Sequence, residues 1–333
     1  MSNLYISNGP APYRTDLCLA LSETGCKVFH YENGDLPVRK WAGKALLKQV
    51  PSLLKREMPD WIIAPEYSPI TLQLAMHRRK AGFRLLVLCD DSIGMIQGND
   101  YSISHKVGRR IVPSLVDGII LSTPVAVDWY RARFGKGILM PIVADERRVR
   151  PELERVLPLS ERLRPGEKPV VAFVGRLVGL KNIPTLIRAF EPLKDRAQLV
   201  IIGDGPLRDA LEAMAPDALF TGQLSGDELL AWYNLIDILV LPSTQEAYGA
   251  VTGEALMAGA KVVVSRKAGS ADLVREGENG FVVDPMDAAA ITDRIGRLLD
   301  TVPSGRPVAL RENLLPYRFE SCIRNLLEEI NAL

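Results

Sequence analysis

The chain has 333 residues, a formal net charge of +1 and 24% charged residues. A domain usually holds about 100–200 residues, so this length predicts two domains. The 47% hydrophobic fraction excludes a disordered chain, and the near-zero net charge argues against a nucleic-acid-binding protein. The four cysteines show neither metal-ligand nor CxxC spacing. The start, MSNLYISNGP, lacks the features of a signal peptide, so we expect a cytoplasmic protein.

The first half alternates short apolar runs with amphipathic stretches. The pattern predicts strands at 4–7, 26–31, 61–64, 84–89 and 118–122, and helices at 15–23, 69–81 and 124–134. Nearly continuous apolar strands between helices indicate a parallel sheet that is covered on both faces. We therefore predict that residues 1–150 form a doubly wound, Rossmann-like α/β domain.

The range 151–168 is rich in Pro, Glu and Arg, and its apolar residues are scattered, which predicts an interdomain linker. The alternation then restarts, with strands expected at 170–174, 198–202, 219–221, 238–241, 261–265 and 280–283. Residues 169–316 are thus predicted to form a second doubly wound domain. The end of the chain, 317–333, contains an amphipathic helix that we expect to pack back on the first domain.

Candidate binding residues follow the predicted strands, because ligands of open α/β sheets bind beyond the carboxyl ends of the strands. Arg176 and Lys181 follow the strand at 170–174. Two cations on one loop suit a diphosphate, although an ordinary solvated loop could carry the same residues. Gly203 opens the turn GDGP, which lacks the third glycine of the dinucleotide fingerprint and could be a plain turn.

Two glutamates, Glu246 and Glu254, follow the strand at 238–241, with Gly249 near a predicted helix start between them. Unpaired N–H groups at a helix N-terminus suit phosphate, and the carboxylates could accept hydrogen bonds from sugar hydroxyls. Taken singly, each glutamate could equally be a helix-dipole or solvent-facing residue.

Five segments of the second half together carry a resemblance. They are FVGRLVGLKN at 173–182, VIIGDGPLRDAL at 200–211, FTGQLSGDELLAWYNLIDILVLPS at 220–243, EAYGAVTGEALMAGAKVVVS at 246–265 and GENGFVVDP at 277–285. In this order they resemble the retaining glycosyltransferases of family four, also called group 1 glycosyltransferases. Glu246 and Glu254, with seven residues between them, match the signature of this family. The resemblance implies the GT-B fold, in which two Rossmann-like domains face each other across a cleft.

The resemblance also implies roles for single residues in the second domain. Arg176 and Lys181 would bind the donor diphosphate, Glu246 the donor sugar and Glu254 the ribose. Backbone N–H groups near Gly249 would add to the phosphate site. The full donor-binding set would be Arg176, Lys181, Gly203, Gln223, Leu224, Glu246, Tyr248, Gly249, Ala250, Val251 and Glu254, with Gln223 and Leu224 against the base.

The first half resembles the family more loosely and would bind the acceptor. PAPYR at 10–14 is similar to the opening loop of one bacterial subgroup, without its paired glycines. The acceptor-side residues would be Gly9, Pro10, Tyr13 and Arg14. Cys89-Asp90-Asp91 stands where many members have His-Asp. The implied catalytic residues are therefore Asp90, Asp91, Arg176, Lys181 and Glu246.

The resemblance implies transfer of a hexose from a nucleoside diphosphate sugar, with UDP favoured over GDP, to a glycan or lipid-linked acceptor. The setting would be bacterial surface polysaccharide, lipopolysaccharide or glycolipid assembly. We expect no metal or other cofactor, because the second domain has no DxD motif. A nucleotide-sugar epimerase and a catalytically silent nucleotide-sugar-binding protein remain alternatives.

Basic residues form clusters at 77–80, 109–110 and 131–136, which could indicate the cellular location of the protein. They fit either a weak, peripheral contact with the anionic inner face of a membrane or an ordinary solvated surface.

Overall fold

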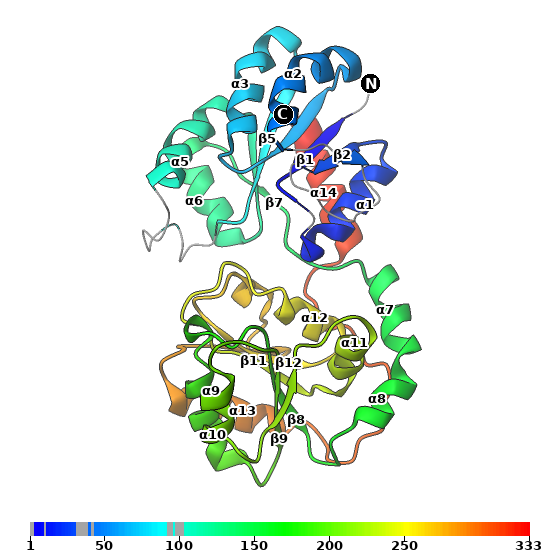
Figure 1. The fold of residues 1–333 in the computed structure, drawn as a ribbon, viewed down its shortest axis with the longest axis vertical. Coiled ribbons are helices and arrows are strands. Elements are labelled where there is room, and N and C mark those ends of the chain that lie inside the picture. Colours follow the sequence, from blue (N-terminus) through cyan, green and yellow to red (C-terminus); the bar gives the residue numbers. More distant parts are fainter. Residues whose placement is uncertain (1–2, 10, 31–38, 41–42, 92–95, 97–102) are drawn as a thin grey trace. The chain divides into compact units, whose positions relative to one another are not determined.

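The computed structural model describes residues 3–9, 11–30, 39–40, 43–91, 96 and 103–333. Its contacts divide the chain into two compact units (Figure 1). The N-terminal unit is Met1–Ile142 together with Glu320–Leu333, and the C-terminal unit is Val143–Phe319. No helix among the described residues is long and apolar enough to cross a membrane.

The N-terminal unit is built on a parallel sheet of seven described strands in the order β3-β2-β1-β4-β5-β6-β7. The strands are β1 (Leu4–Ser7), β2 (Lys27–His30), β3 (Arg39–Lys40), β4 (Trp61–Pro65), β5 (Arg84–Cys89), β6 (Gly118–Leu121) and β7 (Ile138–Leu139). The helices are α1 (Thr15–Glu23), α2 (Gly43–Glu57), α3 (Pro69–Ala81), α5 (Ile103–Leu115), α6 (Pro124–Phe134) and α14 (Phe319–Ala332), with the short 3-10 helix η1 (Pro12–Arg14) before α1.

Local signals explain why α3 and α6 begin and end where they do. Ser68 caps α3 by accepting a hydrogen bond from the amide of Thr71 at 3.3 Å, and Pro69 occupies the first helical position. Gly82 ends the helix with a left-handed φ of +74°, which glycine adopts without steric cost. Helix α6 repeats this design with a Thr cap, Pro at the first position and Gly after the last. Both helices coincide with the ranges predicted from the sequence.

The final helix, α14, lies in the N-terminal unit. Arg84, at the start of β5, donates hydrogen bonds from Nη1 to the carbonyls of Ile330 at 2.7 Å and Asn331 at 3.1 Å. Leu326 and Ile330 on the apolar face of α14 are fully buried.

The C-terminal unit contains a six-stranded parallel sheet in the order β10-β9-β8-β11-β12-β13. The strands are β8 (Val170–Val174), β9 (Gln198–Ile202), β10 (Leu219–Gly222), β11 (Ile238–Leu241), β12 (Lys261–Ser265) and β13 (Gly280–Val283). The helices are α7 (Glu146–Arg155), α8 (Leu157–Leu163), α9 (Ile183–Phe190), α10 (Arg208–Met214), α11 (Gly226–Leu235), α12 (Val251–Met257) and α13 (Ala288–Leu299). The 3-10 helices are η2 (Gly179–Lys181), η3 (Glu191–Leu193) and η4 (Gly269–Leu273).

Both sheets are doubly wound, which confirms the predicted fold class. In each sheet the chain starts in an inner strand, moves to one edge and then returns to build the other side. The strand order reverses between β1 and β4 and between β8 and β11. Ligands of such sheets bind at this switch point, at the carboxyl ends of the strands.

The range 151–168 differs from the linker that we expected. Most of it is helical, in α7 and α8, and the boundary between the two units lies earlier, at Ile142–Val143. Leu153 is buried, and its carbonyl accepts a hydrogen bond from Asn234 of α11 at 2.8 Å. Asn234 also bonds Ser160 of α8 at 3.3 Å. The buried residues Leu153, Ser160 and Asn234 thus attach this largely polar segment to the C-terminal unit.

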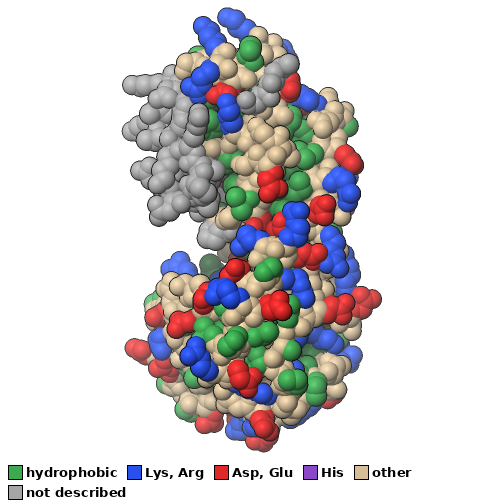
Figure 2. Space-filling model, turned by 90° about the vertical axis from the view of Figure 1, so that its right-hand side faces the viewer, with side chains coloured by type: hydrophobic (Ala, Val, Ile, Leu, Met, Phe, Trp, Pro, Cys, Tyr) green, Lys and Arg blue, Asp and Glu red, His purple; other side chains and the backbone are tan. Residues whose placement is uncertain are grey.

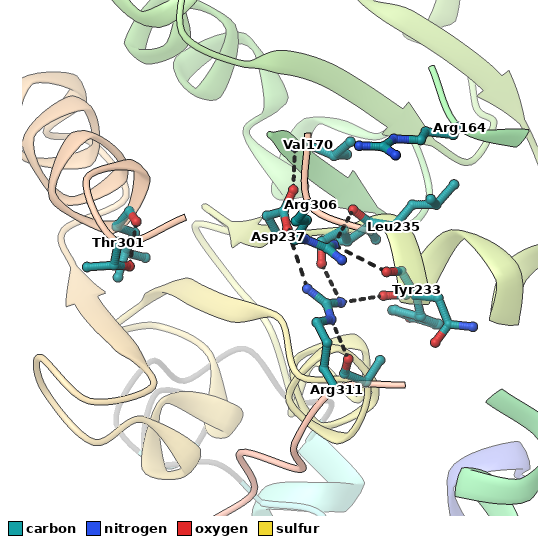
Figure 3. Close-up of polar contacts among 12 residues, drawn as sticks. Arg164, Val170, Tyr233, Leu235, Asp237, Thr301, Arg306 and Arg311 are labelled. Carbon is teal, nitrogen blue, oxygen red and sulfur yellow. Dashed lines mark hydrogen bonds and ion pairs between the residues drawn. The ribbon is translucent and has the colours of Figure 1, made fainter. Parts of the chain in front are cut away.

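A return segment after α13 is attached to the base of the C-terminal sheet by two arginines (Figure 3). Arg306 bonds the Asp237 carboxylate at 2.5 Å, and the other oxygen of Asp237 accepts the amide of Val170 at 2.8 Å. Arg311 donates to the carbonyls of Tyr233 at 3.0 Å and Ile236 at 2.7 Å. These contacts lie at the amino ends of β8 and β11, away from the switch point. On the face drawn in Figure 2, basic and acidic side chains are interspersed over this unit.

Candidate functional site

The loops after β8 and β11 meet through one ion pair in the C-terminal unit. Lys181, in η2, pairs through Nζ with the carboxylate of Glu246, in the loop after β11. Ser243 donates a longer hydrogen bond of 3.4 Å to the same carboxylate oxygen. The Lys181 and Glu246 side chains are 22% and 14% exposed, so the pair is partly shielded from solvent. Two residues 65 positions apart are thus brought together at the switch point between β8 and β11.

Arg176 lies directly after β8 on the same loop. It is exposed, and its side chain makes no hydrogen bond or ion pair with any residue that the structure describes. Its guanidinium is therefore available to an anionic ligand near Lys181. An arginine can bind two phosphate oxygens at once, whereas a lysine acts as a point charge.

Gly203, which follows β9, has a structural reason to be glycine. It has a φ of +136°, and a Cβ there would lie 1.9 Å from the carbonyl oxygen of Gly175. The amide of Gly175 bonds the carbonyl of Ile202 at 2.9 Å. The backbones of the two loops therefore approach closely, and no side chain fits at Gly203.

The predicted phosphate-binding segment leads into α12. Tyr248 is buried, and its carbonyl accepts the amide of Ser270 at 2.8 Å. Gly249 has a φ of +91°, and a Cβ there would lie 3.2 Å from Cγ of Glu246. Ala250 precedes α12 and Val251 is its first residue. The first amides of a helix lack an acceptor within it, so they suit an anion.

Glu254 lies one turn into α12 and is exposed, yet densely surrounded by protein. Its carboxylate accepts a hydrogen bond from the hydroxyl of Tyr233, a buried residue of α11. The surrounding protein raises the pKa of Glu254, and the hydrogen bond from Tyr233 opposes this rise. Tyr233 holds one carboxylate oxygen in place. Gln223 and Leu224, which follow β10, are exposed and half-buried, respectively.

In the N-terminal unit, an open hollow lies at the switch point between β1 and β4. Gly9, Tyr13, Arg14, Glu66 and Asp90 are among its lining residues. Arg14 is buried and pairs with the Asp90 carboxylate, which also accepts a hydrogen bond from the Tyr13 hydroxyl at 3.3 Å. Pro10 lies outside the described residues.

The structure separates the neighbouring carboxylates Asp90 and Asp91. The Asp90 side chain is 29% exposed and lines the hollow. Asp91 is 1% exposed, and its oxygens accept hydrogen bonds from Arg109 at 2.9 and 3.2 Å and from Tyr130 at 2.6 Å. The Tyr67 hydroxyl adds a bond of 3.2 Å. Asp91 thus serves the packing of α5 and α6 on β5 and is not available to a substrate.

Glu66 is a lining residue that the sequence reasoning missed. It follows β4 directly and has a φ of +34°, which is rare for a residue with a side chain. Burial raises the pKa of Glu66 to about 7, and the nearby charges of Asp90 and Asp91 act in the same direction. The strand-end rule that selected Arg176 would also have selected Glu66 and Ser243.

Among the described residues, no group of three or more His, Cys, Asp or Glu side chains is arranged to hold a metal ion. The four cysteines are all buried and free.

Comparison with known proteins finds similarity over part of the chain. Residues 168–301 match the family model described as "Glycosyl transferases group 1". A GDP-mannose-dependent alpha-mannosyltransferase of Corynebacterium glutamicum is 40% identical over 122 residues, covering 37% of this chain and 29% of the relative. A GDP-mannose-dependent alpha-(1-6)-phosphatidylinositol monomannoside mannosyltransferase of Mycobacterium tuberculosis is 30% identical over 227 residues, covering 61% and 58%. The chain therefore spans less than two thirds of the length of these relatives.

Among solved structures, HepE of Anabaena in complex with UDP superposes with a TM-score of 0.78 at 17% identity, with 100% of both chains covered. This likeness concerns the fold of the whole chain.

Proposed function

We propose that the chain is a glycosyl transferase of group 1, a proposal that the match of residues 168–301 to this family model supports. It transfers a hexose from a nucleoside diphosphate sugar to a hydroxyl of an acceptor. One observation carries this proposal: a cation and a carboxylate, Lys181 and Glu246, meet at the switch point beside the exposed Arg176. A diphosphate needs the cations, and a sugar needs a hydrogen-bond acceptor next to them.

The proposed donor site follows the geometry of the C-terminal unit. Arg176 and Lys181 bind the diphosphate, and the amides of Gly249, Ala250 and Val251 add neutral donors. These groups stabilise the charge that develops on the leaving nucleotide as the glycosidic bond breaks. Glu246 binds hydroxyls of the donor sugar. Glu254 is proposed to bind the ribose, and Gln223 and Leu224 to contact the base. Gly203 and Tyr248 are proposed to line the donor site with their backbone atoms.

We propose that the reaction retains the anomeric configuration. The acceptor hydroxyl attacks the anomeric carbon on the face that the diphosphate leaves, and its proton passes to a phosphate oxygen. A double displacement would instead need a carboxylate nucleophile at that carbon. A covalent sugar adduct on Asp90 would contradict the same-face mechanism.

Fixed cations carry the phosphate charge in this proposal, so catalysis needs no metal ion. Activity that survives EDTA supports this point, and activity that returns only with Mg²⁺ contradicts it.

We propose that the N-terminal hollow binds the acceptor. Asp90 offers a partly exposed carboxylate oxygen, and Arg14 fixes its orientation. Glu66 lies in the same hollow. Carboxylates suit the hydroxyls of a glycan or of a sugar headgroup on a lipid. The name of the Mycobacterium tuberculosis relative, with its phosphatidylinositol mannoside, supports a lipid-linked acceptor of a bacterial glycolipid or surface polysaccharide.

The donor remains to be chosen between two nucleotides. The sequence pattern favoured UDP, whereas both relatives named above are GDP-mannose-dependent. We propose GDP-mannose as the first donor to test and UDP-glucose as the second.

A thermal-shift panel of nucleoside diphosphate sugars tests the donor site, because a ligand that binds the folded state raises the melting temperature. Slow release of GDP or UDP from a stabilising donor then reports cleavage of the sugar–phosphate bond. Lys181→Met should lose both the shift and the release. Isomerisation of the donor without release, or binding without turnover, would contradict the transferase proposal.

A further inference from the structure

Helices α5 and α6 of the N-terminal unit form an open, basic and aromatic hollow that the proposed donor and acceptor sites do not use. Its lining residues are Lys106, Val107, Arg109, Arg110, Trp129, Arg133 and Phe134. The basic clusters at 109–110 and 131–136, which are separate in the sequence, contribute to this one surface. No acidic side chain is among the described residues that line it.

Only part of this positive charge is used to hold the fold. Arg109 bonds the buried Asp91. Lys106, Arg110 and Arg133 have no ion pair with any residue in the described part of the chain. Arg133 lies over two aromatic rings, 5.5 Å from the centroid of Trp129 and 5.8 Å from that of Phe134. These three cations are therefore available to an anionic partner.

Apolar side chains accompany the cations. Val107 and Ile111, one turn apart on α5, are each 48% exposed. Together with Trp129 and Phe134 they make the surface amphipathic. A helix that combines exposed aliphatic side chains with Lys and Arg suits the interface between lipid headgroups and acyl chains. A free anion would use the cations but would not cover Val107 and Ile111.

The basic cluster on α3 has a different explanation. Arg78 pairs with Asp117 at 2.9 Å and donates to the carbonyl of Leu115 at 2.9 Å. Arg79 and Lys80 occupy the last turn of α3, where cations are favoured by the helix dipole. This cluster therefore provides a matched control of equal charge.

We propose that the surface formed by Lys106, Val107, Arg110, Ile111, Trp129 and Arg133 binds the phosphate-bearing headgroups of an anionic membrane lipid. The cations bind the phosphates, and the apolar side chains enter the boundary with the acyl chains. This proposal deepens the lipid-linked acceptor of the proposed function. Its test needs no donor, so the two can fail separately.

Co-sedimentation of the full chain with phosphatidylcholine vesicles, with and without phosphatidylglycerol, tests the proposal. The wild type should bind only the vesicles with phosphatidylglycerol, and less at high salt. The double variant R110Q/R133Q should reduce the partition coefficient about thirtyfold, since each lost cation weakens binding about fivefold. The control R79Q/K80Q removes the same charge and should bind nearly as the wild type does. An equal loss in both variants would overturn the proposal.

Trp129 reports where the lipid lies. Brominated phospholipids should quench part of the tryptophan fluorescence of vesicle-bound wild type, and Trp129→Phe should remove most of that quenching in the fraction that sediments with the vesicles. Quenching that persists in Trp129→Phe would locate the contact elsewhere. Full competition by inorganic phosphate at millimolar concentration would identify a site for free anions and would also overturn the proposal.

Discussion

Replacement of Glu246 by Gln offers the sharpest test of the donor site, because the structure predicts opposite effects on binding and on turnover. In the structure, Lys181 is paired with Glu246. A nucleoside diphosphate without its sugar must compete with the Glu246 carboxylate for Lys181. It has no sugar hydroxyl that could donate a hydrogen bond to Glu246 in place of Lys181. Glu246→Gln removes the competing charge, so free UDP or GDP should bind more tightly.

The magnitude follows from the surroundings of the pair. A charge-assisted hydrogen bond contributes about 1.5–3 kcal/mol when shielded, and an exposed ion pair less than about 1 kcal/mol. Side chains that are 22% and 14% exposed lie between these limits. If the Lys181–Glu246 pair contributes about 1–2 kcal/mol, its removal should raise the affinity for the nucleoside diphosphate about five- to thirtyfold. Turnover of the nucleotide sugar should fall, because the contact to the donor sugar is lost.

Isothermal titration with UDP and GDP measures this gain directly. Lys181→Met should weaken nucleotide binding, and the double variant K181M/E246Q should show no further gain over K181M. Nucleoside diphosphate binding that is unchanged or weaker in Glu246→Gln would refute the reasoning. A gain of the same size in the double variant would show that the effect is not due to Lys181.

Three further predictions concern stability. The folded state keeps a proton on Glu66 up to about pH 7, whereas the unfolded chain loses it near pH 4.5. The stability of the wild type should therefore decrease as the pH rises from about 4.5 to about 7. Glu66→Gln should raise the melting temperature at pH 8 but not at pH 4.5. Equal gains at both pH values would contradict this. Asp91→Ala should cost about 3–5 kcal/mol in urea unfolding, since it leaves Arg109 without its buried partner, and Asp90→Ala should cost clearly less; similar losses would contradict the different roles. Gly203→Ala should cost more than about 3 kcal/mol, because its Cβ would meet the Gly175 carbonyl; wild-type stability would show that the loops can separate.

Signals that act within a few residues could be read from the sequence. The Ser or Thr cap, the following Pro and the closing Gly determine where α3 and α6 begin and end. Apolar runs indicated the strands, and the loop residues after two of them, Arg176 and Glu246, were assigned to the correct edge of the C-terminal sheet. Helix α2 was not predicted from the sequence; Pro51, a residue type that usually interrupts a helix, lies inside it.

The tertiary structure decided what local signals could not. The polar segment 151–168 joins the C-terminal unit because Asn234 binds Leu153 and Ser160, a contact between residues more than seventy positions apart. Asp90 and Asp91 are chemically identical neighbours in the sequence. Only the fold makes one a lining residue of an open hollow and the other the buried partner of Arg109. Successive side chains after a strand point in different directions. The sequence therefore shows which residue types follow a strand, but not which of their side chains a ligand can reach.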